Sequence, residues 1–278
     1  MKPDTSTDRD TRIDPFSVIA DGAVIGAGVT IGPFCRIGAD VVIEDNVVLH
    51  SHVVVEGVTR IGADTQVHPF TTLGTPPQHV RYKGEPTRLE IGPGCDIREG
   101  VSVHRGTTFG GGVTRVGAGV MMMNETHIGH DCVIGDHVIM AAKATLAGHC
   151  IVGDNALIGG LAAVHQFVRI GSRACIGGYA AVRGDLIPFG MATGTEARLR
   201  GLNVVGLKRS GSSRSTMLAL RAAYRTLFVE PGPPFRERID PVAERFADIP
   251  EVGEIIAFLR AESHRPLIHT ARQSSARD

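Results

Sequence analysis

The sequence predicts a mainly β chain that folds as a parallel β-helix and ends in a small α-helical domain. An aliphatic residue recurs at every sixth position, and a small or β-branched residue follows it by four. Apolar residues take a helical spacing only towards the C-terminus. The 35 glycines, with no Trp and three Tyr, agree with a chain that turns often and fills its interior with aliphatic side chains.

The aliphatic column defines the predicted solenoid. Its first members are Ile13, Ile19, Ile25, Ile31, Ile37, Ile43, Leu49, Val55, Ile61, Val67 and Leu73. The column returns at Ile91, Ile97, Val103 and Phe109, slips by one residue, and runs from Val116 to Val182. Each six residues form a short strand and a turn in such a repeat, and three of them close one triangular coil of 18 residues. We therefore predict a β-helix over residues 13–195.

The breaks in this frame, at about 74–90 and 105–115, are predicted to be loops extruded from the solenoid. Loops on a rigid scaffold commonly carry binding groups, so substrate contacts are expected there. Four of the five cysteines, Cys35, Cys95, Cys132 and Cys150, fall in the small inward column and are interpreted as packing residues. Without paired spacing they argue against a secreted disulfide framework.

The helical domain is expected over residues 196–266. In SSRSTMLALRAAYRTLF, the residues Met217, Leu220, Tyr224 and Leu227 share one helical face, and two further amphipathic segments follow, bounded by proline. Residues 1–12 and 267–278 are expected to be disordered.

Charge and hydropathy exclude several classes of function. Lys plus Arg equals Asp plus Glu at 29 each, so no global field favours nucleic acid or an anionic membrane surface. No apolar stretch approaches the roughly 18 residues of a membrane span, and the N-terminus lacks the apolar region of a signal peptide. A cytoplasmic location is therefore expected.

Histidines cluster in the second half of the predicted solenoid. In NETHIGHDC, His127 and His130 flank the inward Ile128, so at least one of them should reach the surface. Adding one coil and then a second to position 130 gives 148 and 166. The histidines expected to line one edge in successive coils are His130, His149 and His165, with Gln166 beside the last. A neutral imidazole can take a proton from a hydroxyl that attacks an activated acyl group, and Asp131 is a candidate to orient it.

Six segments, GEPTR, HRGT, THIGHDC, TLAGHC, AVHQF and NVVGLKR, occur in this order at characteristic separations. Through them the chain resembles the UDP-N-acetylglucosamine O-acyltransferase family of hexapeptide-repeat acyltransferases over nearly its whole length. The resemblance implies a left-handed β-helix and a homotrimer with its sites between neighbouring solenoids. It also implies transfer of a (3R)-hydroxyacyl chain from acyl carrier protein to the 3-position of UDP-N-acetylglucosamine, the first step of lipid A biosynthesis. Neither a cofactor nor a metal is implied, since the phosphopantetheine thioester of the carrier is a substrate.

The same resemblance assigns roles to individual positions. His130 matches the general base, and the Gly148 backbone N–H would hold the developing oxyanion. Gly178 matches the position that sets acyl-chain length, where the lack of a side chain should admit a longer chain. The other residues implied to bind substrate are His127, His149, His165, Gln166, Gln78, His79, Arg81, Asn203 and Arg209.

Three positions depart from the family pattern. His79 and Val205 stand where an acidic residue is typical, and Ser210 stands where a second arginine is typical beside Arg209. His79 raises the alternative that the acceptor is the 3-amino analogue of the sugar, because loss of a carboxylate helps to keep an attacking amine uncharged. The basic residues Lys208, Arg209, Arg214 and Arg221 are either a contact for the acidic carrier protein or an ordinary solvated face.

Three rival functions follow from the residues. The later N-acyltransferase of the same pathway carries an N-terminal domain before its solenoid, whereas these repeats begin near residue 13. A zinc-dependent carbonic anhydrase of β-helix type would use histidines from adjacent faces as ligands. A non-catalytic scaffold gives no reason for several histidines to align beside two extruded loops.

Overall fold

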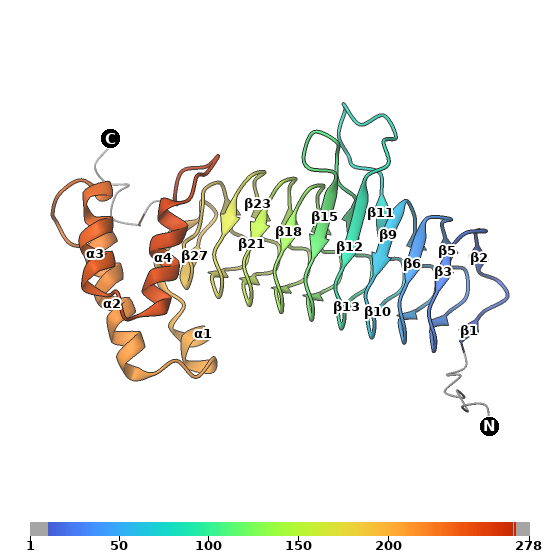
Figure 1. Cartoon of the computed structure of the whole chain (residues 1–278), viewed down its shortest axis with the longest axis horizontal. Coiled ribbons are helices and arrows are strands. Elements are labelled where there is room, and N and C mark those ends of the chain that lie inside the picture. Colours follow the sequence, from blue (N-terminus) through green and yellow to red (C-terminus); the bar gives the residue numbers. More distant parts are fainter. Residues whose placement is uncertain (1–10, 269, 271–278) are drawn as a thin grey trace, which may run out of the picture.

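The computed structural model describes residues 11–268 and 270, and it shows a solenoid capped at its C-terminal end by a helical domain (Figure 1). Short strands stack in three sheets, one on each side of the prism, and all strand pairs are parallel except β27 with β28. The prediction of a left-handed parallel β-helix followed by a small helical part is confirmed.

The first sheet contains, in sheet order, β1 (Arg12–Ile13), β4 (Thr30–Ile31), β7 (Val48–Leu49), β10 (Gln66–Val67), β13 (Asp96–Ile97), β16 (Met121–Met122), β19 (Ile139–Met140), β22 (Leu157–Ile158), β25 (Cys175–Ile176), β27 (Gly190–Thr193) and β28 (Arg198–Leu202). The second contains β2 (Val18–Ile19), β5 (Arg36–Ile37), β8 (Val54–Val55), β11 (Thr72–Thr75), β14 (Ser102–His104), β17 (His127–Ile128), β20 (Thr145–Leu146), β23 (Ala163–Val164) and β26 (Ala181–Val182). The third contains β3 (Val24–Ile25), β6 (Val41–Ile43), β9 (Val58–Ile61), β12 (Arg88–Ile91), β15 (Val113–Val116), β18 (Val133–Ile134), β21 (Ile151–Val152) and β24 (Arg169–Ile170).

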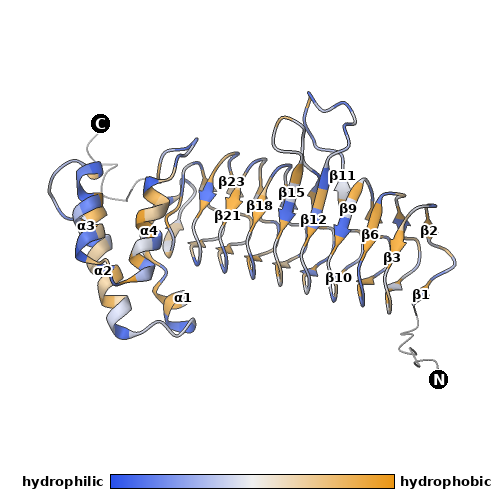
Figure 2. Ribbon diagram, in the orientation of Figure 1, coloured by the Kyte–Doolittle hydropathy of each residue, from blue (hydrophilic) through white to orange (hydrophobic). Residues whose placement is uncertain are grey.

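Strand pairing reproduces the 18-residue coil. Ile31 pairs with Leu49, and Ile128 pairs with Leu146, each one coil further along the chain. The aliphatic column fills the prism, and hydrophobic residues lie along the strands throughout its length (Figure 2). The first coil is less well buried: Ile13 is 44% exposed, and Ile19 and Ile25 are partly buried, because no coil of the described residues covers them on the N-terminal side.

The prediction is wrong for one member of the aliphatic column. Phe109 is 39% exposed and lies in the second extruded loop rather than inside the prism. The chain leaves the solenoid after β14 and returns only at Val113, so the apolar side chain at this spacing belongs to the loop. The four cysteines of the inward column are buried free thiols, as predicted, and the Cys35 and Cys132 Sγ atoms donate to the carbonyls of His50 and Ala147 in the next coil.

Two loops leave the same side of the solenoid close together (Figure 1). The first joins β11 to β12 across residues 76–87, and the second joins β14 to β15 across residues 105–112. The first loop departs at Gly74, where the pairing of β11 with β14 shifts register. Gly74 has a φ of +72°, and a Cβ there would lie 2.0 Å from Thr59 Oγ1, so only glycine fits.

The helical domain consists of α1 (Val204–Arg209), α2 (Arg214–Phe228), η1 (Phe235–Arg238), α3 (Ile239–Arg245) and α4 (Pro250–Arg260). Leu220 and Leu227 of α2 pack with Val252 and Ile256 of α4 in a core of their own. No described helix is both long enough and apolar enough to cross a membrane.

After α4, residues 261–268 form an extended segment, the C-terminal strap, which returns along the end of the solenoid. Asp185 makes two backbone hydrogen bonds to the strap: its N–H donates to the Pro266 carbonyl at 2.8 Å, and its carbonyl accepts from the Ile268 N–H at 2.9 Å. The tail expected to be disordered from 267 onward is therefore ordered at Leu267 and Ile268, because both side chains pack against the solenoid core. The remainder of that tail, apart from Thr270, and residues 1–10 lie outside the described residues.

Gly74→Ala is expected to destabilise the protein by about 3 kcal/mol, since it combines left-handed strain with a backbone and side-chain clash. Gly94→Ala is the matched control: its φ is +67°, yet nothing lies within 4 Å of the added Cβ. Strain alone should cost about 1 kcal/mol there. Unfolding followed by circular dichroism measures both variants, and equal losses would contradict the clash at Gly74.

Candidate active site

The candidate site is built on one edge of the solenoid, where three successive coils turn. Asp131, His149 and Phe167 occupy the same corner position, with φ values of 59°, 63° and 65°. The His149 N–H donates to the His130 carbonyl at 2.9 Å, and the Phe167 N–H donates to the Gly148 carbonyl at 3.2 Å. The corner conformation is one that Asp and His adopt more readily than most residues, and it directs their side chains outward in a stack.

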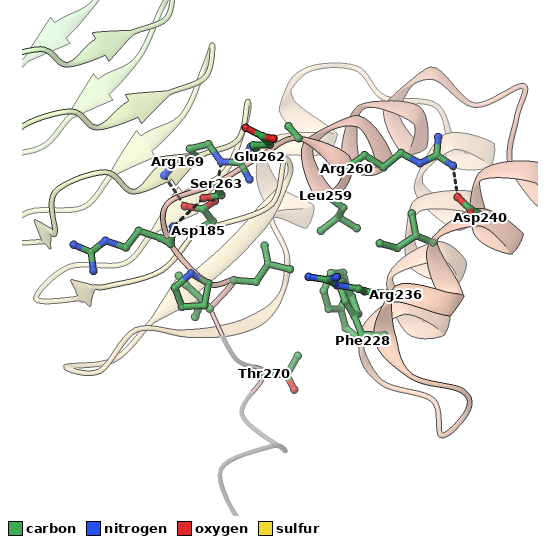
Figure 3. Close-up of a pocket in the computed structure, with 17 residues that line it drawn as sticks. Arg169, Asp185, Phe228, Arg236, Asp240, Leu259, Arg260, Glu262, Ser263 and Thr270 are labelled. Carbon is green, nitrogen blue, oxygen red and sulfur yellow. Dashed lines mark hydrogen bonds and ion pairs between the residues drawn. The ribbon is translucent and has the colours of Figure 1, made fainter. Parts of the chain in front are cut away.

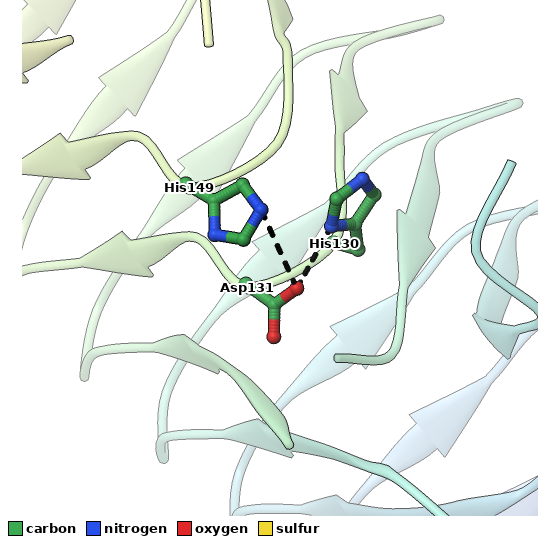
Figure 4. Close-up of side chains that lie close together, drawn as sticks. All are labelled: His130, Asp131 and His149. Carbon is green, nitrogen blue, oxygen red and sulfur yellow. Dashed lines mark hydrogen bonds and ion pairs between the residues drawn. The ribbon is translucent and has the colours of Figure 1, made fainter. Parts of the chain in front are cut away.

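His130 and Asp131 form a hydrogen-bonded pair at this edge. The Nδ1 atom of His130 lies 2.8 Å from Oδ2 of Asp131, and both side chains are largely buried (Figure 4). Thr107, in the second loop, donates from its backbone N–H to Oδ1 at 2.9 Å and from its hydroxyl to Oδ2 at 2.6 Å. The carboxylate therefore has no freedom to turn away from the imidazole.

Burial is the largest single influence on the Asp131 carboxyl and would raise its pKa. The hydrogen bonds from the side chains of His130 and Thr107, and from the Thr107 backbone, outweigh it, so the pKa is lowered overall. Asp131 is then ionised at neutral pH. An ionised carboxylate accepts the Nδ1–H of neutral His130 and leaves the lone pair of that imidazole on Nε2.

His149 continues the stack. Its ring meets that of His130 edge to face at a centroid distance of 5.0 Å, and Nε2 lies 3.9 Å from Asp131 Oδ2 (Figure 4). On its other side the ring stacks on Phe167 at 4.4 Å, with an interplanar angle of 9°. Burial lowers the His149 pKa, against the opposing effect of Asp131, so this imidazole is neutral at neutral pH.

The two loops close over His130. His79 of the first loop lies 5.3 Å from the His130 ring and 4.7 Å from the ring of Phe109 in the second loop. Arg81 places its guanidinium carbon 4.1 Å above the Phe109 ring, and its backbone N–H donates to His79 Nδ1 at 3.2 Å. The loop position that departs from the family pattern thus lies directly against His130.

Gly148 lies beside the free nitrogen of His130. A Cβ built at Gly148 would lie 2.8 Å from His130 Nε2, so any side chain here would strike the imidazole. Within the described part of the chain, the Gly148 N–H donates no hydrogen bond. A free backbone donor therefore stands next to the free lone pair.

A second histidine pair lies on the neighbouring strands β14 and β17. His127 has Nδ1 2.8 Å from Ser102 Oγ, and its ring lies 4.9 Å from that of His104. Burial, helped by repulsion from neighbouring imidazoles, lowers the His127 pKa and brings that of His104 to about 4. Both are neutral at neutral pH.

The third coil departs from the predicted stack of imidazoles. Phe167, not His165, stacks on His149, because position 167 is two coils on from Asp131. His165 instead lies beside Arg265 of the C-terminal strap, which approaches its Nδ1 at 2.7 Å and donates to the Gln166 carbonyl at 2.9 Å. Arg265 carried no signal in the sequence, because it lies 100 residues from His165 in a segment without the repeat.

Other predicted site residues lie away from His130 within this chain. Asn203 caps α1 by accepting from the Gly206 N–H, and it donates to the Arg173 carbonyl at 3.0 Å. Arg209 ends α1, which lies at the far C-terminal end of the molecule from β18 (Figure 1). Lys208, Val205 and Ser210 are exposed on the same helix or at its end.

Gly178 is exposed at a different corner, one coil after Gly160. A Cβ at Gly178 would lie 3.1 Å from the Gly160 carbonyl oxygen. Gln78, of the first extruded loop, has an exposed side chain.

Thr107, Phe109 and His104 were missed as site residues. The HRGT segment contains His104 and Thr107, so the sequence did mark this region. The position of both side chains relative to His130 depends on how the second loop folds back, which spacing does not reveal. Thr107 is fully buried, and Gly110 lies so close to Asp131 and His149 that a Cβ there would clash with both.

His130, Asp131 and His149 place one possible ligand atom each within 4.8 Å of one another. Asp131 Oδ2, however, already accepts from the Thr107 hydroxyl and lies in hydrogen-bond range of His130 Nδ1. A metal at this point would have to displace the Thr107 hydroxyl and break the His130–Asp131 hydrogen bond, whereas the ligands of zinc sites face the ion. The geometry is that of a hydrogen-bonded acid–base pair rather than a ligand set.

The repeat, the triangular coil and the imidazole–carboxylate edge define a hexapeptide-repeat transferase. A family model described as bacterial transferase hexapeptide (six repeats) matches residues 4–39, and one described as UDP-N-acetylglucosamine O-acyltransferase, domain 2, matches residues 185–268.

Relatives that match over nearly the whole chain indicate the same family. The chain is 56% identical to the acyl-(acyl-carrier-protein)–UDP-N-acetylglucosamine O-acyltransferase of Azorhizobium caulinodans, over 94% of this chain and 96% of that protein. It is 50% identical to the Caulobacter vibrioides enzyme of the same name, over 94% and 99%. The solved structure of LpxA from Acinetobacter baumannii matches with a TM-score of 0.89 at 40% identity, over 92% of this chain and 99% of that one. The chain belongs to the UDP-N-acetylglucosamine O-acyltransferase family.

Acidification is expected to destabilise the fold through His104. Its folded pKa of about 4 lies below the ordinary 6.5, so the unfolded chain binds the proton first and stability falls as the pH drops from about 6.5 to about 4. The full loss is about 3 kcal/mol. His104→Gln should flatten the fall of Tm between pH 7 and 4, with His137→Gln, which removes an exposed imidazole, as the control. An unchanged slope in His104→Gln would contradict a buried neutral His104.

Proposed function

We propose that this protein transfers a (3R)-hydroxyacyl chain from acyl carrier protein to the 3-position of UDP-N-acetylglucosamine, the first step of lipid A biosynthesis. The observation that carries the proposal is the His130–Asp131 pair, buried beneath two loops, in a chain 56% identical to an enzyme named for this reaction. The reaction is proposed to take place in the cytoplasm. The carrier thioester is the only activated group that it needs.

His130 acts as the general base. Asp131 accepts from Nδ1 and is itself held by Thr107, so the lone pair of the neutral ring is on Nε2. Nε2 takes the proton of the sugar 3-hydroxyl as its oxygen attacks the thioester carbonyl directly. No covalent acyl-enzyme forms in this scheme.

Gly148 stabilises the tetrahedral intermediate. Its unoccupied N–H lies next to His130, where it can donate to the oxyanion that develops on the thioester carbonyl. When the intermediate collapses, the C–S bond breaks and the phosphopantetheine sulfur leaves with the proton that His130 Nε2 received. The base returns to its starting state, and the acyl group is on the sugar oxygen.

The remaining contacts are proposed to come from two chains. Seven of the predicted contact residues belong to the solenoid or to the first loop: His127, His149, His165, Gln166, Gln78, His79 and Arg81. Asn203 and Arg209 lie at the far end of the same chain. A homotrimer with sites between neighbouring solenoids would allow a partner's α1 to approach this edge, with Arg209 as a contact for phosphate. The basic residues of α1 and α2 are proposed to meet the acidic carrier.

His130→Ala is expected to lower acyl transfer about a thousandfold, within the range that a general base supplies. The assay follows transfer from hydroxyacyl carrier protein to UDP-N-acetylglucosamine by the purified protein. His137→Ala, which removes an exposed histidine of the same solenoid, should retain activity. Full activity in His130→Ala would eliminate the assigned base, and an inactive parent protein would eliminate the assigned acceptor or donor.

The second candidate is the same reaction on the 3-amino analogue of the sugar, with an amide as product. The position of His79 favours it, since a ring rather than a carboxylate lies 5.3 Å from His130. His79 Nδ1 accepts from the Arg81 backbone, so its neutral form offers an N–H at Nε2 and no negative charge. An amine beside it is not stabilised as an ammonium ion and keeps its nucleophilic lone pair.

Under this candidate, turnover with the 3-amino acceptor should exceed turnover with the 3-hydroxy acceptor. His79→Asp should shift the ratio of kcat/KM towards the hydroxyl by about tenfold, because a carboxylate favours the charged ammonium. Val80→Asp adds the same charge at a neighbouring side chain that is 90% exposed, and it serves as the control. A parent enzyme that strongly prefers the hydroxyl would reject the amine as acceptor.

A further inference from the structure

We infer that Arg265 is a positioning residue for this site: its guanidinium holds His165 in the neutral tautomer that carries its proton on Nε2. The catalytic consequence rests on the proposed function, but the tautomer itself does not. Arg265 lies in the C-terminal strap, far in sequence from the solenoid edge that it contacts.

The donor and acceptor roles follow from the chemistry of the two groups. Arg265 Nη2 lies 2.7 Å from His165 Nδ1, and a guanidinium stays protonated and offers only donors. Nδ1 must therefore be the acceptor and carry the lone pair. The competing contact, from His165 Nδ1 to the Gln166 carbonyl, would require the proton on Nδ1, but it is 3.4 Å long. The short charge-assisted bond outweighs it.

The guanidinium is also fixed at a second point. Arg265 Nε donates to the Gln166 carbonyl at 2.9 Å, so the planar fork contacts two adjacent groups of one corner. The two bonds together define the plane of the guanidinium relative to the His165 ring. A lysine ammonium on a flexible stem could make one of these bonds but has no rigid fork with which to make both.

A buried carboxylate holds the strap in place. Asp185 is 1% exposed, and its Oδ1 accepts from the Arg169 N–H at 2.8 Å. Its Oδ2 accepts from Arg169 Nε at 2.7 Å and from the Ser263 hydroxyl at 2.6 Å (Figure 3). The Asp185 N–H donates to the Pro266 carbonyl, so the strap is tied on both sides of Arg265.

The strap also reaches the catalytic stack. The His264 ring lies 5.3 Å from that of Phe167, which stacks on His149. On the opposite side, Arg265 lines a cavity of about 920 Å³ between the solenoid end and the helical domain, together with Arg169 and Arg236 (Figure 3). None of the predicted site residues lines this cavity. The strap therefore separates it from the histidine edge.

The Nε2 atoms of His130 and His165 therefore have opposite functions. Asp131 accepts at His130 Nδ1 and leaves a lone pair on Nε2, whereas Arg265 donates at His165 Nδ1 and leaves an N–H on Nε2. His130 can remove a proton, and His165 can only donate a hydrogen bond. The geometry suits His165 to a substrate oxygen that accepts, of the carbonyl or phosphate class.

The first experiment determines the tautomer in the full chain without substrate. Long-range nitrogen–proton correlation spectra of protein labelled with ¹⁵N-histidine distinguish a protonated ring nitrogen from one with a lone pair, and His165→Gln assigns the signal. We expect Nε2 protonated and Nδ1 unprotonated. Arg265→Met should give a mixture of tautomers, while Arg265→Lys should retain the parent pattern. Arg236→Met, which removes another arginine of the same cavity, is the control.

His165 with its proton on Nδ1 in the parent protein would overturn the inference, whether or not any variant folds. An unchanged spectrum in a folded Arg265→Met would overturn it as well. For activity, Arg265→Met should lower kcat/KM on the order of tenfold, as expected for loss of a hydrogen bond to a charged group, with partial rescue by Arg265→Lys. A protein that shows the tautomer but transfers no acyl group would refute the proposed function and leave the assignment of Arg265 intact.

Discussion

The backbone ladder between coils is the constraint on which the rest of the structure depends. Each coil donates N–H groups to the carbonyls of the next, as from Thr30 to Val47 and from His127 to Ala144, so residues 18 apart are held one strand spacing apart, about 4.8 Å. No side chain is needed to bring Asp131 and His149 together. The aliphatic column then fixes which face of the chain is inside, and the corner residues are left to carry chemistry.

The supporting polar groups of the site act indirectly, because each one fixes another residue rather than meeting the substrate itself. Thr107 fixes Asp131, which sets the free lone pair of His130, and Asp185 fixes the strap that carries Arg265. These supporting groups are buried, while the nitrogens that they control are at the edge. The interior of the prism is mainly aliphatic in this protein, and its buried polar side chains there are threonines such as Thr59, Thr65 and Thr71 rather than charged groups.

The period in the sequence predicted the prism, the coil length and the edge that holds His130, because each depends on local spacing alone. It also predicted where the two loops leave. It failed for Phe109, because a hydrophobic residue at the expected spacing cannot reveal that the chain has already left the prism. It failed again for His165 and Phe167, which differ by a shift of two positions at the corner. Arg265 was beyond reach, because its contact joins segments 100 residues apart.

The coil register has a consequence for how such a chain can change in length. Insertion or loss of one hexapeptide would turn everything downstream by a third of a revolution, and a loop or histidine would emerge from a different face of the prism. Only whole coils of 18 residues can be gained or lost without that rotation. Within the described residues, the ring and polar contacts of His130 come from the two loops and from its own and the following coil, so a whole coil N-terminal to β11 can be gained or lost without altering them.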